Sequence, residues 1–133
     1  MAGSAFPESP LEFGVFDWID NQDEFIQASD LVMGRAGHGT IMKSLLYGKP
    51  MVLVPIPDHT EQYGNARRAA SLHVAEMIDQ DRLNQSTVAA EVSKVLGNSE
   101  YAQSAERISR EAASMHAITT ACDLVQALAA NSP

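Results

Sequence analysis

Short runs of apolar residues alternate along this chain with longer stretches in which apolar residues recur at helical spacing. The runs at 31–33 and 51–54 are almost continuously apolar, which is typical of strands buried on both faces of a sheet. Residues 13–18 and 74–78 also have strand-like composition, although polar Glu76 interrupts the second. Since strands alternate with helices, we predict an α/β fold with a parallel sheet of about four strands and helices on both faces.

Helices are expected at 22–29, 40–48 and 60–72, between the predicted strands. Asn21 and Glu24 have the spacing of a capping box at the start of the first of these helices. The C-terminal third carries three further apolar stripes, each of which predicts a helix. Their members are Val88, Val92, Val95 and Leu96; Tyr101, Ala105, Ile108, Ala112 and Met115; and Ile118, Ala121, Val125 and Leu128.

Composition places the chain among single globular domains, with 133 residues of which 45% are hydrophobic and 20% charged. A formal net charge of −8 argues against a nucleic acid or an anionic membrane as partner. The chain lacks a membrane-spanning apolar run and a secretory signal, and its single Cys122 fits a reducing compartment. We therefore expect a cytoplasmic protein without direct membrane insertion. Residues 1–12 read as a tag or linker, and residues 13–130 as the domain.

A glycine-rich segment lies between the apolar run at 31–33 and the next predicted helix. Its residues are Gly34, Arg35, Ala36, Gly37, His38, Gly39 and Thr40. Strand, glycine loop, helix and strand in this order form a phosphate-binding βαβ unit, in which main-chain N–H groups at the helix start hold an anion. A nucleotide diphosphate is therefore the leading ligand, and the alternative interpretation of the segment is a tight turn without a ligand.

Other candidate chemistry is weaker. The Asp79-Gln80-Asp81 segment has the letters of a metal-binding DxD, but a solvated turn after a strand is the better interpretation. His59 beside Asp58 has the form of a general base and its orienting carboxylate, although a loop histidine more often binds than catalyses. No His/Cys cluster has metal-ligand spacing, so no metal is expected.

Four segments occur in order along the chain: Trp18 with Phe25 seven residues later, ASDLVMGRAGHGT at 28–40, YGKPMVLVPIP at 47–57, and HTEQYGNA at 59–66. Together they resemble the C-terminal, donor-binding half of GT-B glycosyltransferases, and in particular the branch that contains the peptidoglycan-pathway N-acetylglucosaminyltransferase. The resemblance extends from Trp18 to about Leu128. It implies a Rossmann-like domain that binds a UDP-sugar such as UDP-N-acetylglucosamine as a substrate, with no cofactor.

The resemblance also implies three groups of donor contacts. These are the base and ribose region at Phe16, Trp18 and Lys43; the diphosphate at Gly37, His38, Gly39, Thr40 and Arg35; and the donor sugar at Glu61, Gln62 and Asn65. Glycines permit close backbone approach, and a hydroxyl or imidazole can donate to phosphate. A carboxylate beside an amide suits the paired hydroxyls of a sugar.

Two departures from the family pattern bear on function. Lys43 stands where the family has a glutamate that grips the ribose hydroxyls, and lysine has no acceptor, so it could serve phosphate instead. The leading part of the donor half and the acceptor half, with its catalytic base, do not match anything in this chain. The sequence thus resembles an N-terminally truncated piece of such an enzyme, and we expect it to be inactive alone. A missing acceptor half or a partner subunit would complete it, and that missing part could associate with a membrane.

Two alternatives to the transferase stay open: a fragment of a nucleotide-sugar 2-epimerase, and a non-catalytic donor-binding or assembly subunit. A strand at 13–18 would lie at an open edge of the sheet, so a homodimer formed by strand pairing is a further expectation.

Overall fold

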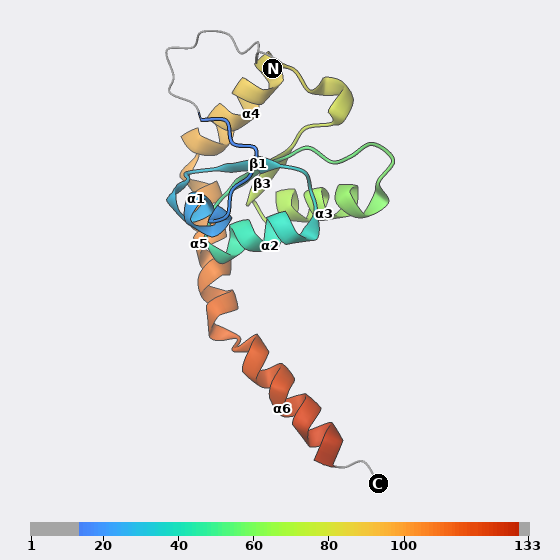
Figure 1. Ribbon diagram of the computed structural model, residues 1–133. Helices are drawn as coiled ribbons and strands as arrows, with labels where there is room; N and C mark the ends of the chain where they lie inside the picture. Colours follow the sequence, from blue (N-terminus) through green and yellow to red (C-terminus); the bar gives the residue numbers. More distant parts are fainter. Residues whose placement is uncertain (1–13, 131–133) are drawn as a thin grey trace.

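A computed structural model describes residues 14–130 as a three-stranded parallel sheet with helices around it (Figure 1). The strands are β1 (Val32–Gly34), β2 (Met51–Leu53) and β3 (Ala75–Met77), in the order β1-β2-β3, with Met51 opposite Val32 and Ala75. The helices are α1 (Gln22–Ala28), α2 (His38–Leu46), α3 (Thr60–Ser71), α4 (Gln85–Gly97), α5 (Ser99–Ser114) and α6 (Ala117–Ala130), with a 3-10 turn, η1 (Gln80–Arg82), after β3.

The central strand β2 is buried on both faces, as its unbroken apolar run predicts. Met51 and Leu53 pack with residues of α2, α3 and α5, whereas Val52 and Val54 point to the other face and pack against α4 and the start of α5. All of these side chains are almost fully excluded from solvent. The predicted parallel sheet with helices on both faces is confirmed.

The prediction of a fourth strand at 13–18 is wrong. Residues 14–18 form no strand, and Phe13 lies outside the described residues. Phe16 contacts Phe25 of α1 edge to face, with 5.6 Å between ring centroids, and Trp18 remains 80% exposed. Aromatic and β-branched composition favours a strand only where a neighbouring strand is available. The edges of the sheet are β1 and β3, so the expected homodimer loses the strand on which it was based.

Local signals set several helix ends, although two differ from prediction. Helix α2 begins at His38 rather than at Thr40. Asn21 is at the N-cap position of α1, but its side chain makes no cap hydrogen bond, and its NH2 group donates to the carboxylate of Glu24 at 2.8 Å. After α2 the chain turns at Gly48, whose φ is +66°. A Cβ there would also lie 3.3 Å from the Cα of Glu106 on α5, so both the turn and the close helix approach require glycine.

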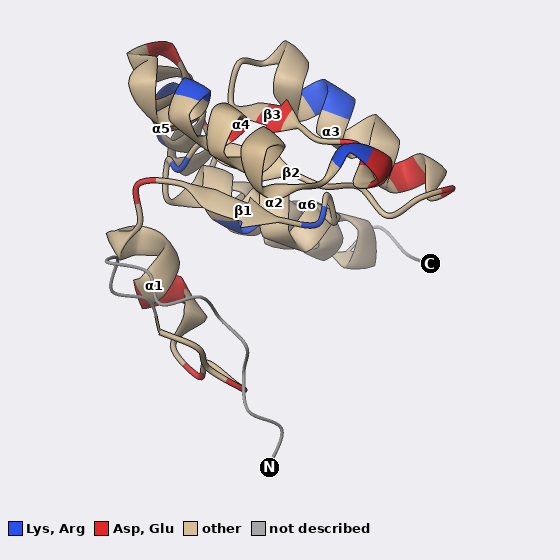
Figure 2. Cartoon of the chain, turned by 90° about the horizontal axis from the view of Figure 1, so that it is seen from above, with Lys and Arg blue, Asp and Glu red and all other residues tan. Residues whose placement is uncertain are grey.

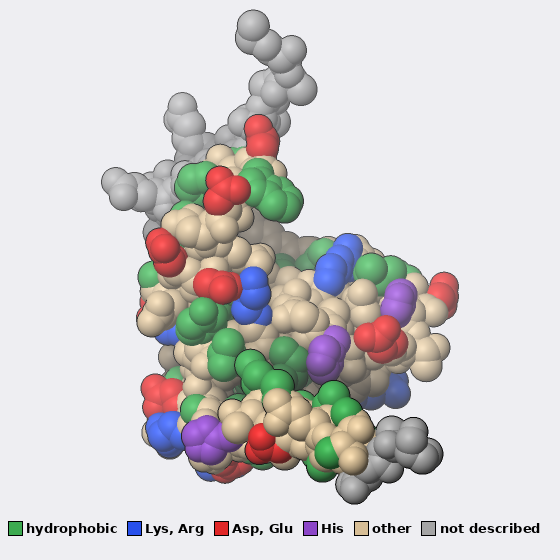
Figure 3. Space-filling model, turned by 60° about the horizontal axis from the view of Figure 1, so that its bottom comes forward, with side chains coloured by type: hydrophobic (Ala, Val, Ile, Leu, Met, Phe, Trp, Pro, Cys, Tyr) green, Lys and Arg blue, Asp and Glu red, His purple; other side chains and the backbone are tan. Residues whose placement is uncertain are grey.

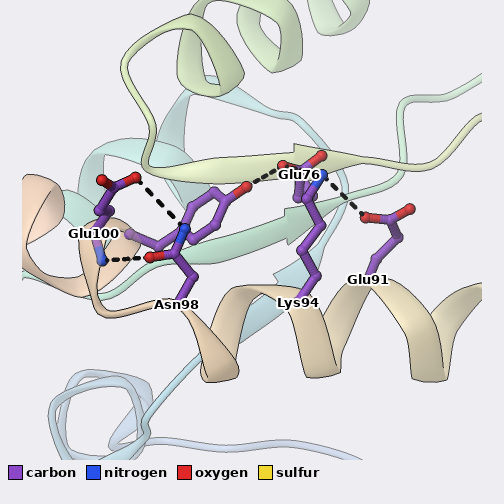
Figure 4. A network of polar contacts seen from close by, with 6 residues as sticks. Glu76, Glu91, Lys94, Asn98 and Glu100 are labelled. Carbon is purple, nitrogen blue, oxygen red and sulfur yellow. Dashed lines mark hydrogen bonds and ion pairs between the residues drawn. The ribbon is translucent and has the colours of Figure 1, made fainter.

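Polar Glu76 is accommodated in β3 by side chains from the helices beside it (Figure 4). The hydroxyl of Tyr101 donates to Glu76, and the ammonium of Lys94 lies 2.8 Å from the same carboxylate oxygen. Burial raises the pKa of Glu76, but the hydrogen bonds and charge of its partners outweigh this effect and lower the pKa from its ordinary value. A paired carboxylate can therefore occupy a strand that is otherwise apolar.

Helix α5 begins against the body of the domain and then runs beyond it, and α6 continues away from the sheet (Figure 1). The side chains of Tyr101 and Ala105 are buried, whereas every residue from 111 to 130 is exposed. The two helices are separated at His116, which has a φ of +45°. Among the described residues, no helix combines the length and the apolar character needed to cross a membrane.

Candidate functional site at the carboxyl edge of the sheet

The loops that follow the three parallel strands meet at one edge of the sheet, which is visible from above in Figure 2. Strand β1 leads through Arg35 and Ala36 into α2, β2 leads into α3, and β3 leads into η1. Ligands of open parallel sheets bind outside the carboxyl ends of the strands, where such loops converge. The predicted diphosphate and sugar residues all lie on these loops or on the helix turns that follow them.

The start of α2 presents main-chain donors that the protein does not use. The first hydrogen bond of the helix runs from the N–H of Ile41 to the carbonyl of Gly37 at 3.2 Å. The N–H groups of His38, Gly39 and Thr40 precede it and have no acceptor among the described residues. A helix N-terminus with free N–H groups carries partial positive charge and attracts anions.

The fold does not need glycine at positions 37 and 39. Gly37 has a φ of −70°, which any residue can adopt, and Gly39 lies within the helix. A Cβ at either position would meet no atom of the described chain within 4 Å. This differs from Gly48, where both backbone conformation and packing require glycine. The two glycines therefore leave space beside the backbone that the packing of the described residues does not require.

Two adjoining hollows extend from this helix start toward α1. One of about 480 Å³ is lined by Gly39, Thr40 and Lys43 together with residues of β1 and α1. The other, of about 560 Å³, is lined by Phe16, Trp18 and Lys43. Because Lys43 lines both, the residues predicted for the base and ribose adjoin those predicted for the diphosphate.

Lys43 also joins α2 to α1. Its ammonium lies 2.7 Å from the carboxylate of Asp23 and donates to the side-chain carbonyl of Gln22 at 3.1 Å. The family pattern has a glutamate at the position of Lys43. The carboxylate beside this position is that of Asp23, which comes from α1 and is paired with the lysine.

The residues predicted for the donor sugar lie on the first turns of α3, on the side of the glycine loop that is away from α1. Asn65 donates to the carbonyl of Ala36 at 3.2 Å and to the carboxylate of Glu61 at 3.4 Å, so it joins α3 to the loop. The side-chain carbonyl of Gln62 accepts from the N–H of Ile56 at 3.1 Å, which leaves its amide NH2 group for other partners.

The side chain of Arg35 is exposed and reaches across the sheet edge to the two neighbouring strand ends. Its Nη1 donates to the carbonyl of Val54 at 3.2 Å, at the end of β2, and to the side-chain carbonyl of Gln80 in η1. Gln80 is 45 residues away in the chain. The sequence drew attention to its segment only for the two flanking aspartates and gave no reason to pair Gln80 with Arg35.

The weaker candidate chemistry is not assembled into a site. Among the described residues, the imidazole of His59 forms no hydrogen bond or ion pair with Asp58, and such a pair is the less favoured of the two interpretations of this segment. Burial, followed by the charge of Asp79 and a hydrogen bond to it, raises the pKa of Tyr63. Within residues 14–130, no three His, Cys, Asp or Glu side chains are placed to hold a metal ion.

A parallel sheet covered by helices on both faces, with a helix N-terminus open at its carboxyl edge, defines a Rossmann-like α/β domain. The family described as "Glycosyltransferase family 28 C-terminal domain" matches residues 3–121, and the chain belongs to this family. The resemblance noted in the sequence is thereby confirmed at the level of the family.

Individual relatives agree with this assignment. The chain is 44% identical over 61 residues (46% of this chain) to an uncharacterized glycosyltransferase of Methanosarcina acetivorans. It is 33% identical over 107 residues (79% of this chain) to the UDP-N-acetylglucosamine–N-acetylmuramyl-(pentapeptide) pyrophosphoryl-undecaprenol N-acetylglucosamine transferase of Zymomonas mobilis. These matches span 16% and 28% of the relatives' own lengths.

Solved structures show the same fold. The crystal structure of the glycotransferase of kitacinnamycin superposes with a TM-score of 0.82 and 26% identity, over 94% of this chain and 31% of that enzyme. The chain therefore corresponds to less than a third of the length of each of these glycosyltransferases.

Proposed function

We propose that this chain is the donor-binding part of a glycosyltransferase that transfers a hexosyl group from a UDP-sugar, with UDP-N-acetylglucosamine as the leading donor. The choice of donor is supported by the relative from Zymomonas mobilis, whose name specifies that sugar nucleotide. The acceptor and the catalytic base would be supplied by the part of the enzyme to which this chain does not correspond.

The observation that carries the proposal is the helix start at His38–Thr40. Its N–H groups lack acceptors among the described residues, and the adjacent glycines leave open space that the fold does not require. On one side lies the hollow with Phe16 and Trp18, and on the other lie Glu61 and Asn65. Base, diphosphate and sugar would bind in this order along the edge, which is their order in the donor.

The role of each group follows from its chemistry. The amides of α2 and the hydroxyl of Thr40 would stabilise negative charge as it grows on the departing diphosphate, with Arg35 as a further cation. The carboxylate of Glu61 and the amide NH2 of Gln62 would bind sugar hydroxyls. Because these groups can stabilise the charge of the departing diphosphate, we propose that no bound metal is needed. Transfer with inversion is proposed on the family resemblance alone.

Titration of the chain with UDP by calorimetry tests the proposal. Gly39→Ala should lower UDP affinity at least tenfold, because its Cβ enters the space beside the diphosphate, while helix propensity raises stability by up to about 1 kcal/mol. Gly97→Ala at the end of α4 is the matched control, since a Cβ there also meets nothing within 4 Å. It should leave UDP affinity unchanged. Absence of UDP binding to the unaltered chain would reject the proposal.

Turnover is a separate expectation. We propose that the isolated chain transfers no sugar, because the acceptor site and base are expected elsewhere. Release of UDP from UDP-N-acetylglucosamine, measured with the chain alone and an added lipid-linked acceptor, should not exceed the protein-free rate. Robust transfer would show that the chain contains its own base, and His59 would be the first residue to replace.

A further inference from the structure

The contacts of Arg35 define how its charge is held at the sheet edge. From the loop after β1 the guanidinium crosses the end of β2 and reaches η1 after β3, so one side chain bridges all three strand ends. Its two acceptors among the described residues, the carbonyl of Val54 and the side-chain carbonyl of Gln80, are both bonded through Nη1. Within residues 14–130 the donors on Nε and Nη2 have no acceptor, so they remain for a ligand.

Both acceptors of Arg35 are neutral groups, so neither cancels the charge of the guanidinium, although acidic residues lie nearby. Gln80 is flanked by Asp79 and Asp81, yet no carboxylate among the described residues forms an ion pair with Arg35. Asp79 instead interacts with the phenol of Tyr63 through a side-chain hydrogen bond; after burial, its charge and this bond raise the pKa of Tyr63. The amide thus fixes the guanidinium in place without neutralising it.

We infer that Gln80 is a positioning residue for phosphate binding: it holds the charged guanidinium of Arg35 at the carboxyl edge so that Nε and Nη2 face a diphosphate at the start of α2. The inference rests on the proposed function. It assigns a purpose to the amide between the two aspartates, where a carboxylate would pair with Arg35 and cancel the charge offered to the ligand.

The test compares UDP with uridine as ligands in calorimetric titrations of the whole chain. Gln80→Glu should lower UDP affinity about tenfold or more, since a charge-assisted contact to phosphate is lost, and should leave uridine affinity unchanged. Gln80→Leu, which removes the acceptor without adding charge, should lower UDP affinity less. Gln103→Glu on α5 carries the same charge change away from this edge and should have no effect. Thermal unfolding of each variant monitors the fold.

A double-mutant cycle separates positioning from direct repulsion of the ligand. If Gln80 acts through Arg35, then Gln80→Glu should have little further effect on UDP affinity in an Arg35→Met background. Equal losses with and without Arg35, equal losses for UDP and uridine, or unchanged UDP affinity in both Gln80 variants would each overturn the inference. Failure of the unaltered chain to bind UDP would remove the proposed function and this inference together, whereas binding that is insensitive to Gln80 would remove only the inference.

Discussion

The first half of α5 and the whole of α6 carry apolar stripes of the same helical period but have different surroundings. Tyr101 and Ala105 of α5 are buried, and the helix packs against α2 and α4. Ile118 and Val125 of α6 are 82% and 66% exposed, and no residue of α6 is buried. Hydrophobic side chains accordingly lie open on the face of the molecule shown in Figure 3.

The difference shows what a periodic pattern establishes. A stripe of apolar residues predicts that a segment is helical and which face is apolar. The stripe does not predict whether another part of the domain packs against the apolar face. Such packing depends on where the preceding helix ends and on the direction in which the chain continues. Stability should therefore reside in the sheet and its covering helices and depend little on α6.

The largest effect is expected from the central strand. Leu53→Ala should lower the free energy of unfolding by about 2–5 kcal/mol, because the side chain is fully buried between β2 and the helices and its removal leaves a cavity. Chemical denaturation followed by circular dichroism measures the loss. A change below about 1 kcal/mol would mean that the core is not packed as described.

An intermediate effect is expected where α4 and α5 meet β3. Glu76→Gln should lower the free energy of unfolding by about 1 kcal/mol at neutral pH, because the contacts from Tyr101 and Lys94 lose their charged acceptor. The folded pKa of Glu76 is lowered from its ordinary value, so this stabilisation is fully present above the pKa of the unfolded chain and is lost as the pH falls through the folded pKa. The variant should therefore lose less stability than the unaltered protein on acidification.

Glu111→Gln is the matched control for that comparison. Its carboxylate pairs with Arg107 at 3.0 Å on the exposed part of α5, where both side chains are more than half open to solvent. A pair of this kind contributes little, so stability should change by less than about 0.5 kcal/mol and its acid dependence should not change. Equal effects of the two variants would show that Glu76 is not specifically paired.

The smallest effect is expected from α6. Leu124→Ala repeats the substitution made at Leu53, but here the side chain is 61% exposed, so the free energy of unfolding should change by less than about 0.5 kcal/mol. A loss above about 1 kcal/mol would contradict the contrast between the body and α6. Denaturation at two protein concentrations would then distinguish contacts between copies from contacts within one chain.

Short segments of the sequence placed the candidate site. The glycine loop predicted an anion site or a tight turn, and the N–H groups of α2 that lack acceptors among the described residues are consistent with the anion site. The contacts of Lys43 with Asp23, and of Arg35 with Gln80, could not be predicted, since each joins residues that only the tertiary fold brings together.

The sequence by itself determined the alternation of strands and helices, the parallel sheet, the buried central strand and the position of the glycine loop. These features depend on local periodicity and on apolar runs that must be covered on both faces. The tertiary structure decided that 14–18 is not a strand, that Glu76 is paired inside the domain and that α6 extends away from it. The physical reason is that a strand, a buried charge and an apolar helix face each depend on a partner that lies far away in the chain.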